Sequence, residues 1–307
     1  MKINTWIFEE GYIRPDTVTL EHNSGANNYS KIPKNKEFYK SYKPLRNYPL
    51  IRVQNPLFIR FKWDLTYHVI NILNFFYFRN YKHHRKAKIY REYIGWVRRF
   101  SKKEITTRFY LPKQLEYLKD KKFFLVPLQL SHDFQITEHS KYTSTLEMID
   151  EVINSFDQYA SNETCLVFKI HPFDTLVVDS IKYIKKKLKN KKHLRKRILV
   201  LDGGHLPTLI NQSKGVIIIN STVGLQSLSN RKPTKALGNA IYNFEGLTDM
   251  QSLENFWKNP KEPNLKLVHN FKKYLLDQNQ FNGGFYSKHG ISIAIPFVTQ
   301  KILEVNL

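Results

Sequence analysis

Five short apolar runs, each followed by a helical or polar stretch, lie between residues 121 and 237 and constrain the fold more than any other feature. The runs cover residues 123–128, 165–170, 197–201, 215–219 and 234–237. Helical patterns fill the gaps, at about 143–160, 175–190, 206–212 and 222–229. Strands that alternate with helices predict βαβ units and a parallel sheet of about five strands. The single cysteine, Cys165, falls in the second run, which predicts a buried thiol rather than a nucleophile.

Polar loops follow four of these runs and predict the position of a binding site. In a doubly wound sheet, ligands bind beyond the carboxyl ends of the strands. The loops cover residues 129–136, 171–174, 202–205 and 220–224. We therefore expect them to gather at one edge of the sheet.

Side chains in these loops suit an anionic ligand. Lys169 and His171 end the second strand and can both donate to a phosphate. Ser221 or Thr222 opens a helix and can bind phosphate with the free N–H groups there, although a plain N-cap explains the same residues. Asp133 has the chemistry of a nucleophile, a base or an electrostatic stabiliser.

The sequence lacks the motifs that mark serine hydrolases and metal-dependent enzymes. The chain contains no G-x-S-x-G nucleophile elbow, which weighs against a serine hydrolase. The first loop also has no spaced second carboxylate or histidine motif of the kind that holds a metal.

The first hundred residues have a different character. Residues 1–55 are interrupted by prolines and read as irregular and strand-like, while residues 57–103 are helical, aromatic and basic. This basic region suits an anionic lipid surface, but it equally suits a helical hairpin packed on its own domain with a solvated basic face. Glu10 and Arg14 flank a glycine turn, where a surface turn and an acid–base pair with a carboxylate clamp are both possible.

The net charge of the chain indicates an anionic partner but does not identify which kind. Lys and Arg number 49 against 26 Asp and Glu, a net charge of +23, which attracts nucleic acid, anionic lipid or small anions. No recognised RNA- or DNA-binding motif is present, so we expect no nucleic-acid partner. The lone cysteine favours the cytoplasm, and no run of about 18 apolar residues predicts a spanning helix.

Taken together, motifs along the chain resemble those of the bacterial capsule-polysaccharide synthesis family, especially its single-module β-Kdo transferase branch. Kdo is the eight-carbon acidic sugar 3-deoxy-manno-octulosonic acid. The matching motifs are FEEGYIRP (8–15) with TLE (19–21), QLSHDFQI (129–136) with His139 and Ser140, FKIHP (168–172), NSTVGL (220–225), GNAIY (238–242), and GLT (246–248) with Phe256 and Trp257.

The resemblance implies a retaining glycosyltransferase that uses CMP-Kdo as donor and a Kdo-terminated, phosphatidylglycerol-linked lipid as acceptor. Asp133 matches the expected nucleophile and Glu10 the acidic motif that assists as acid or base. His171, Ser221 and Thr222 match positions expected to hold the CMP phosphate, and Gln129 belongs to the same donor loop. Beyond the resemblance, the charges of Lys169 and Arg14 suggest further contacts to the phosphate or the sugar carboxylate. No cofactor or metal is expected.

The resemblance also sets the expected architecture: an α/β, two-Rossmann-domain glycosyltransferase of the GT-B type, with a truncated N-terminal domain and a helical basic insertion. The expected domains are 1–111, the remnant of the acceptor-side domain; 112–255, the nucleotide-sugar domain; and 256–307, helices that pack back across both. The expected location is cytoplasmic and peripheral on the inner membrane, beside capsule assembly and export proteins. A truncated, non-catalytic capsule-assembly protein that binds nucleotide or lipid is the alternative.

Overall fold

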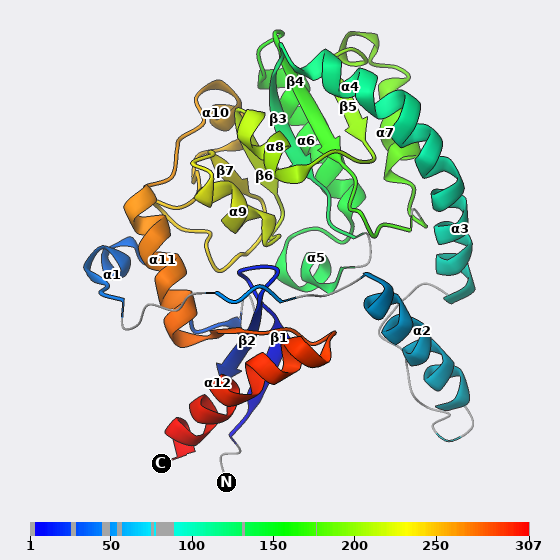
Figure 1. The fold of residues 1–307 in the computed structure, drawn as a ribbon. Helices are drawn as coiled ribbons and strands as arrows, with labels where there is room; N and C mark the ends of the chain where they lie inside the picture. The colour runs from blue at the N-terminus through cyan, green and yellow to red at the C-terminus, as the bar shows by residue number, and fades with distance from the viewer. Residues whose placement is uncertain are drawn as a thin grey trace. The chain divides into compact units, whose positions relative to one another are not determined.

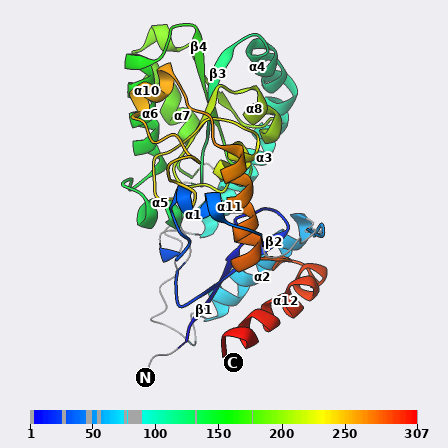
Figure 2. The same cartoon turned by 90° about the vertical axis from the view of Figure 1, so that its left-hand side faces the viewer.

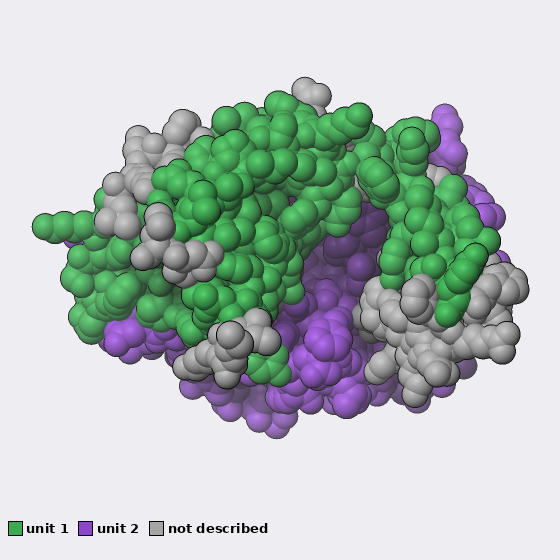
Figure 3. All heavy atoms as spheres, turned by 90° about the horizontal axis from the view of Figure 1, so that it is seen from below, with its two compact units in different colours: residues 1–33, 37–84, 269–307 green, residues 34–36, 85–268 purple. Residues whose placement is uncertain are grey.

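The structure is a computed structural model that describes residues 4–25, 29–44, 50–53, 57–74, 77, 89–130, 133–175 and 177–306. The chain forms two compact units (Figure 3). Unit 1 combines residues 1–33, 37–84 and 269–307, and unit 2 combines residues 34–36 and 85–268. The boundaries expected from the sequence, after residues 111 and 255, differ from this division.

Unit 2 is built on a five-stranded parallel sheet (Figure 1). Its order is β5-β4-β3-β6-β7, and every pairing in it is parallel. The strands are β3 (Lys122–Pro127), β4 (Thr164–Lys169), β5 (Ile198–Leu201), β6 (Gly215–Ile218) and β7 (Thr234–Ala236). The predicted α/β class and the Rossmann-like parallel sheet are confirmed.

Helices cover both faces of this sheet (Figure 2). One face carries α6 (Thr145–Tyr159) and α7 (Ser180–Leu188), and the other carries α4 (Leu111–Leu118) and α8 (Leu206–Gln212). The remaining helices of unit 2 are α3 (Ile89–Ile105), the π-helical turn η2 (Thr106–Tyr110), α5 (Phe134–His139), the 3-10 turn η3 (Lys192–Leu194), α9 (Val223–Ser229) and α10 (Leu253–Lys258).

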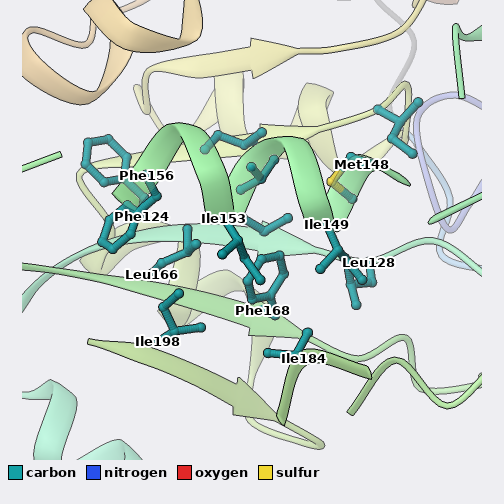
Figure 4. Packing of buried hydrophobic residues seen from close by; sticks show 14 of the residues in the cluster. Phe124, Leu128, Met148, Ile149, Ile153, Phe156, Leu166, Phe168, Ile184 and Ile198 are labelled. Atoms are coloured by element: carbon teal, nitrogen blue, oxygen red, sulfur yellow. The ribbon is translucent and has the colours of Figure 1, made fainter. Parts of the chain in front are cut away.

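The core of unit 2 lies between the sheet and α6. Figure 4 shows Ile149 and Ile153 of α6 among Phe124 of β3 and Leu166 and Phe168 of β4, all fully buried. Burial of one such side chain stabilises a fold by about 1.5–3 kcal/mol. Cys165 is buried in β4 as predicted, and burial raises the pKa of its thiol.

Unit 1 contains a three-stranded antiparallel sheet in the order β1-β2-β8. The hairpin of β1 (Trp6–Glu10) and β2 (Thr17–His22) pairs with β8 (Gln280–Asn282) from the far end of the chain. Gln280 fixes the hairpin loop, because its Oε1 accepts from the Tyr12 backbone N–H at 2.6 Å and from the Thr17 hydroxyl at 3.1 Å. The helices are α1 (Lys36–Ser41), α2 (Leu57–Asn74), α11 (Leu265–Gln278), which continues from unit 2, and α12 (Lys288–Asn306).

The structure differs from the expectations drawn from the sequence in two places. The sequence analysis expects residues 256–307 to be helices, whereas the structure adds the strand β8 there. The basic region expected to belong to the N-terminal part is divided: α2 belongs to unit 1 and α3 to unit 2.

Candidate functional site

The carboxyl ends of β3 and β6 form the switch point of the unit 2 sheet. From β3 the chain passes to β4 and β5 on one side, and β6 then lies on the other side of β3. Ligands of doubly wound sheets bind in the crevice at such a point, outside the carboxyl ends of the strands. The loops after β3 and β6 therefore flank the candidate site, and the loop after β4 is their neighbour.

Gln129 and Asn220 join the two flanking loops. The Gln129 amide Nε2 donates to Asn220 Oδ1 at 3.0 Å, and both side chains are buried. The Asn220 Nδ2 group donates to the backbone carbonyls of Gln135 at 2.7 Å and His139 at 3.2 Å. Asn220 thus fixes the geometry of the switch point, a role that its position at the start of a motif does not reveal. Contact of Gln129 with a nucleotide stays a prediction.

Asp133 sits at the start of α5. Its Oδ1 accepts from the backbone N–H of Gln135 at 3.0 Å, so it is the N-cap of that helix. The side chain is half-buried, which keeps the carboxylate within reach of solvent. Ser131 and His132, in the same motif, lie outside the described residues. The cap fixes the Asp133 carboxylate, and its role as nucleophile stays a prediction.

Ser221 and Thr222 lie between β6 and α9. The Ser221 hydroxyl accepts from the Val223 backbone N–H at 3.2 Å, whereas Thr222 takes the N-cap position without a side-chain cap bond. Tyr242 stabilises this turn, because its buried hydroxyl donates to the Ser221 carbonyl. A Cβ at Gly224 would collide with the Tyr242 ring, so this close approach requires glycine.

Lys169, the last residue of β4, is only 5% exposed. Burial lowers the pKa of its ammonium group from the ordinary 10.5. The nearby Asp202 carboxylate opposes that shift, while the Arg99 and Lys103 cations add to it. Lys169 therefore lies in a buried charged cluster, and its contact with a phosphate stays a prediction.

His171 follows β4 and is half-buried. Its Nδ1 accepts from the backbone N–H of Phe173 at 3.1 Å. An Nδ1 that accepts places the proton of the neutral ring on Nε2. This tautomer has its donor on Nε2, and contact of His171 with a phosphate stays a prediction.

Arg99, on α3, is a site-adjacent residue that the sequence patterns did not single out. It is 3% exposed, and one of its terminal nitrogens lies 2.6 Å from Asp202 Oδ1. The other donates to the backbone carbonyl of Asp174. Arg99 thereby holds together the loops that follow β4 and β5. No local signal distinguishes it from the exposed cations around it, because its partner lies about a hundred positions along the chain.

Glu10 and Arg14 belong to unit 1, whereas the other six predicted site residues belong to unit 2. Glu10 ends β1, and its Oε2 lies 2.9 Å from an Arg14 nitrogen. The Arg14 Nε also donates to the Gly11 carbonyl at 3.2 Å. The two side chains form a local pair in the hairpin loop, and their roles in a reaction stay predictions.

The described part of the chain contains neither a metal-binding group of side chains nor a membrane-spanning helix. No group of three or more His, Cys, Asp or Glu side chains there could hold a metal ion. No helix there is long and apolar enough to cross a bilayer. The expected independence from metal stays a prediction.

Comparisons with known proteins agree with the resemblance of the motifs. A family model described as "Capsule polysaccharide biosynthesis protein" matches residues 1–286. The capsule polysaccharide export protein KpsS of Escherichia coli is 35% identical over 288 residues, which cover 91% of this chain and 72% of that protein. The capsule polysaccharide modification protein LipB of a serogroup A Neisseria meningitidis is 32% identical over 292 residues, which cover 92% and 69%.

Among solved structures, KpsC of Thermosulfurimonas dismutans, a β-Kdo 2,7 transferase, aligns with 96% of this chain and 78% of its own, with 16% identity and a TM-score of 0.41. The family model covers most of the chain, and the curated relatives exceed 30% identity over most of their own length. The chain therefore belongs to the capsule polysaccharide biosynthesis protein family.

Proposed function

We propose that this protein is a retaining glycosyltransferase of capsule assembly, which moves Kdo from CMP-Kdo to a Kdo-terminated, phosphatidylglycerol-linked acceptor. One observation carries the proposal: in a chain of this family, the motif residues of unit 2 follow adjacent parallel strands at the switch point. The motif resemblance supplies the identity of donor and acceptor.

The donor phosphate is assigned to the loops after β4 and β6. His171 offers Nε2–H, and the hydroxyls of Ser221 and Thr222 stand before α9. Charge on the phosphate increases as CMP departs, so donors fixed there stabilise the transition state more than the ground state. Gln129 and Lys169 are assigned as further polar contacts to the nucleotide part of the donor.

The sugar chemistry is assigned to two carboxylates. Asp133 is held by its Oδ1 cap, and its Oδ2 attacks the anomeric carbon of Kdo. The carbon–oxygen bond to the phosphate breaks, and CMP leaves with the electron pair. The acceptor hydroxyl then displaces Asp133 while Glu10 takes the hydroxyl proton, and two inversions give net retention. Arg14, paired with Glu10, is assigned to the carboxylate of the sugar.

The reaction so written needs no cofactor and no metal. Because the acceptor is a lipid, the protein is assigned to the cytoplasmic side of the inner membrane as a peripheral protein, beside the other proteins of capsule assembly and export. A net charge of +23 favours approach to an anionic membrane surface.

The test is transfer from CMP-Kdo to a Kdo-lipid acceptor by Asp133→Asn. Asparagine caps helices as well as aspartate does, so the fold is retained while the attacking charge is lost. Asp179→Asn is the matched control, because Asp179 caps α7 through the same kind of bond, to Lys182 N at 2.8 Å. We expect transfer to fall at least a hundredfold in the first variant, by analogy with the loss of other essential catalytic groups (about 10²-fold or more), and to persist in the second. Undiminished transfer by Asp133→Asn would refute the proposed nucleophile.

A non-catalytic role is the second candidate. The observation that favours it is the sheet of unit 1, which has three antiparallel strands among its described residues rather than a second parallel sheet. In that case the protein binds CMP, measured by calorimetry, and the His171→Ala variant loses this binding, yet no acceptor receives sugar.

A further inference from the structure

The outer face of α3 and η2 carries exposed apolar side chains. Val97 is 70% exposed, Ile105 55% and Phe109 58%. Ile94, Val97, Ser101 and Ile105 recur at steps of three and four, so they share one side of the helix. We call Ile94, Val97, Arg98, Ser101, Ile105, Arg108 and Phe109 the outer face.

The inner side of the same helix contains a buried charge and a close backbone contact. Arg99 is buried there in its ion pair with Asp202. Gly95 lies so close to the carbonyl of Thr175 that a Cβ at this position would overlap it. Surface helices normally turn their apolar residues toward the core, whereas α3 exposes Val97 and Ile105 and buries Arg99. The ion pair and the glycine contact fix this orientation, because rotation of the helix would break both.

Cations border the apolar side chains of the outer face. Arg98 and Arg108 are exposed, and the Arg108 guanidinium carbon lies 5.8 Å from the centre of the Phe109 ring. Residues 89–110 contain six Lys or Arg and two Glu, a net charge of +4. The charge of this segment has the same sign as that of the whole chain.

Exposed aliphatic and aromatic side chains among cations match the headgroup boundary of an anionic bilayer, where apolar groups enter the acyl region and cations meet phosphates. The phosphates of a nucleic acid would pair with the cations but would provide no apolar environment for Val97 or Ile105. We propose that the outer face is the surface by which this protein binds an anionic lipid bilayer. This inference assigns a surface to the membrane location proposed above, and it does not depend on the transfer reaction.

The test is co-sedimentation of the full chain with vesicles of phosphatidylcholine alone and with vesicles of phosphatidylcholine mixed equally with phosphatidylglycerol. Wild-type protein is expected to sediment with the mixed vesicles and to be released by salt. The double variant Val97→Asp, Phe109→Asp places charge where the bilayer would lie, and we expect its affinity to fall at least about tenfold. The variant Arg98→Glu, Arg108→Glu is expected to lose at least about tenfold and to lose its salt dependence.

Met250→Asp is the matched control, since Met250 is an exposed apolar residue of unit 2 outside the outer face. It is expected to bind vesicles as the wild type does. All the substituted residues are exposed, so thermal unfolding should be unchanged, and this measurement accompanies each variant.

Three results would overturn the inference: no wild-type binding to mixed vesicles, unchanged binding by the Val97→Asp, Phe109→Asp variant, or equal loss in Met250→Asp. Binding to random duplex DNA, lost in the arginine variant while vesicles are ignored, would assign the face to nucleic acid instead. CMP binding and Kdo transfer to a water-soluble acceptor are measured on the same variants. Vesicle binding without either activity would refute the proposed function and leave this inference intact.

Discussion

Replacement of Arg99 by methionine tests the role of the buried ion pair beneath α3. The change removes the guanidinium and retains much of the side-chain volume. It leaves the Asp202 carboxylate buried and the Asp174 carbonyl without its donor. Loss of one partner of a buried pair typically costs about 3–5 kcal/mol, because the remaining charge is uncompensated. Lys169 lies near enough to interact with Asp202, so we expect the lower end, about 3 kcal/mol.

Hydrogen exchange of the β4 and β5 amides is the appropriate assay, because it reports opening of unit 2 by itself. Arg98→Met is the matched control: it is the same substitution one position earlier, at an exposed site, and should cost less than about 0.5 kcal/mol. The double variant Arg99→Met, Asp202→Leu removes both charges and should recover part of the loss, with a coupling of about 0.5–3 kcal/mol. A loss in Arg99→Met no larger than in Arg98→Met would refute the reasoning.

Three further changes have defined outcomes. Because the folded pKa of Lys169 lies below 10.5, the folded state binds fewer protons than the unfolded state as pH rises from that lowered pKa to 10.5. Lys169 should therefore make stability rise with pH in this window, and denaturant titrations of Lys169→Met should show a smaller rise than those of the wild type. Gly95→Ala should destabilise unit 2 by about 1–3 kcal/mol, since the added Cβ meets the Thr175 carbonyl; a more stable variant, as helix propensity alone predicts, would contradict this. Asn220→Leu should cost about 1–3 kcal/mol by leaving the Gln129 amide unpaired, with faster exchange in the loops after β3 and β6.

Local patterns were sufficient to predict the parallel sheet of unit 2. Buried strands there are continuous apolar runs, and the helix expected at 206–212 matches α8 (Leu206–Gln212). The apolar runs and the helical pattern depend only on residues that are close in the sequence, so both can be identified without knowledge of the fold. The loops that hold Asp133, His171 and Ser221 follow adjacent strands for the same reason, because carboxyl ends of parallel strands share one edge.

Contacts between distant segments could not be predicted in this way. The sequence marks Arg99 as one cation among many, and only the fold reveals that Asp202 neutralises it inside the protein. Asn220 belongs to a motif that the sequence reveals, but its bonds to Gln129 and to the carbonyls of Gln135 and His139 depend on how two loops meet. Such pairings depend on tertiary geometry, which helix and strand periodicities do not encode.

The pairing of β2 with β8 has a consequence for biosynthesis. Thr17 pairs with Asn282 and Thr19 with Gln280, so the hairpin can receive its third strand only after the intervening residues, most of unit 2 among them, have been synthesised. Apart from residues 34–36, unit 2 is one continuous segment that lies between the hairpin and β8 in the sequence. All residues of unit 2 are therefore synthesised before β8. During elongation, the β2 edge of the hairpin therefore stays unpaired while the residues of the Rossmann-like unit are made, and the small sheet can close only once β8 has been synthesised.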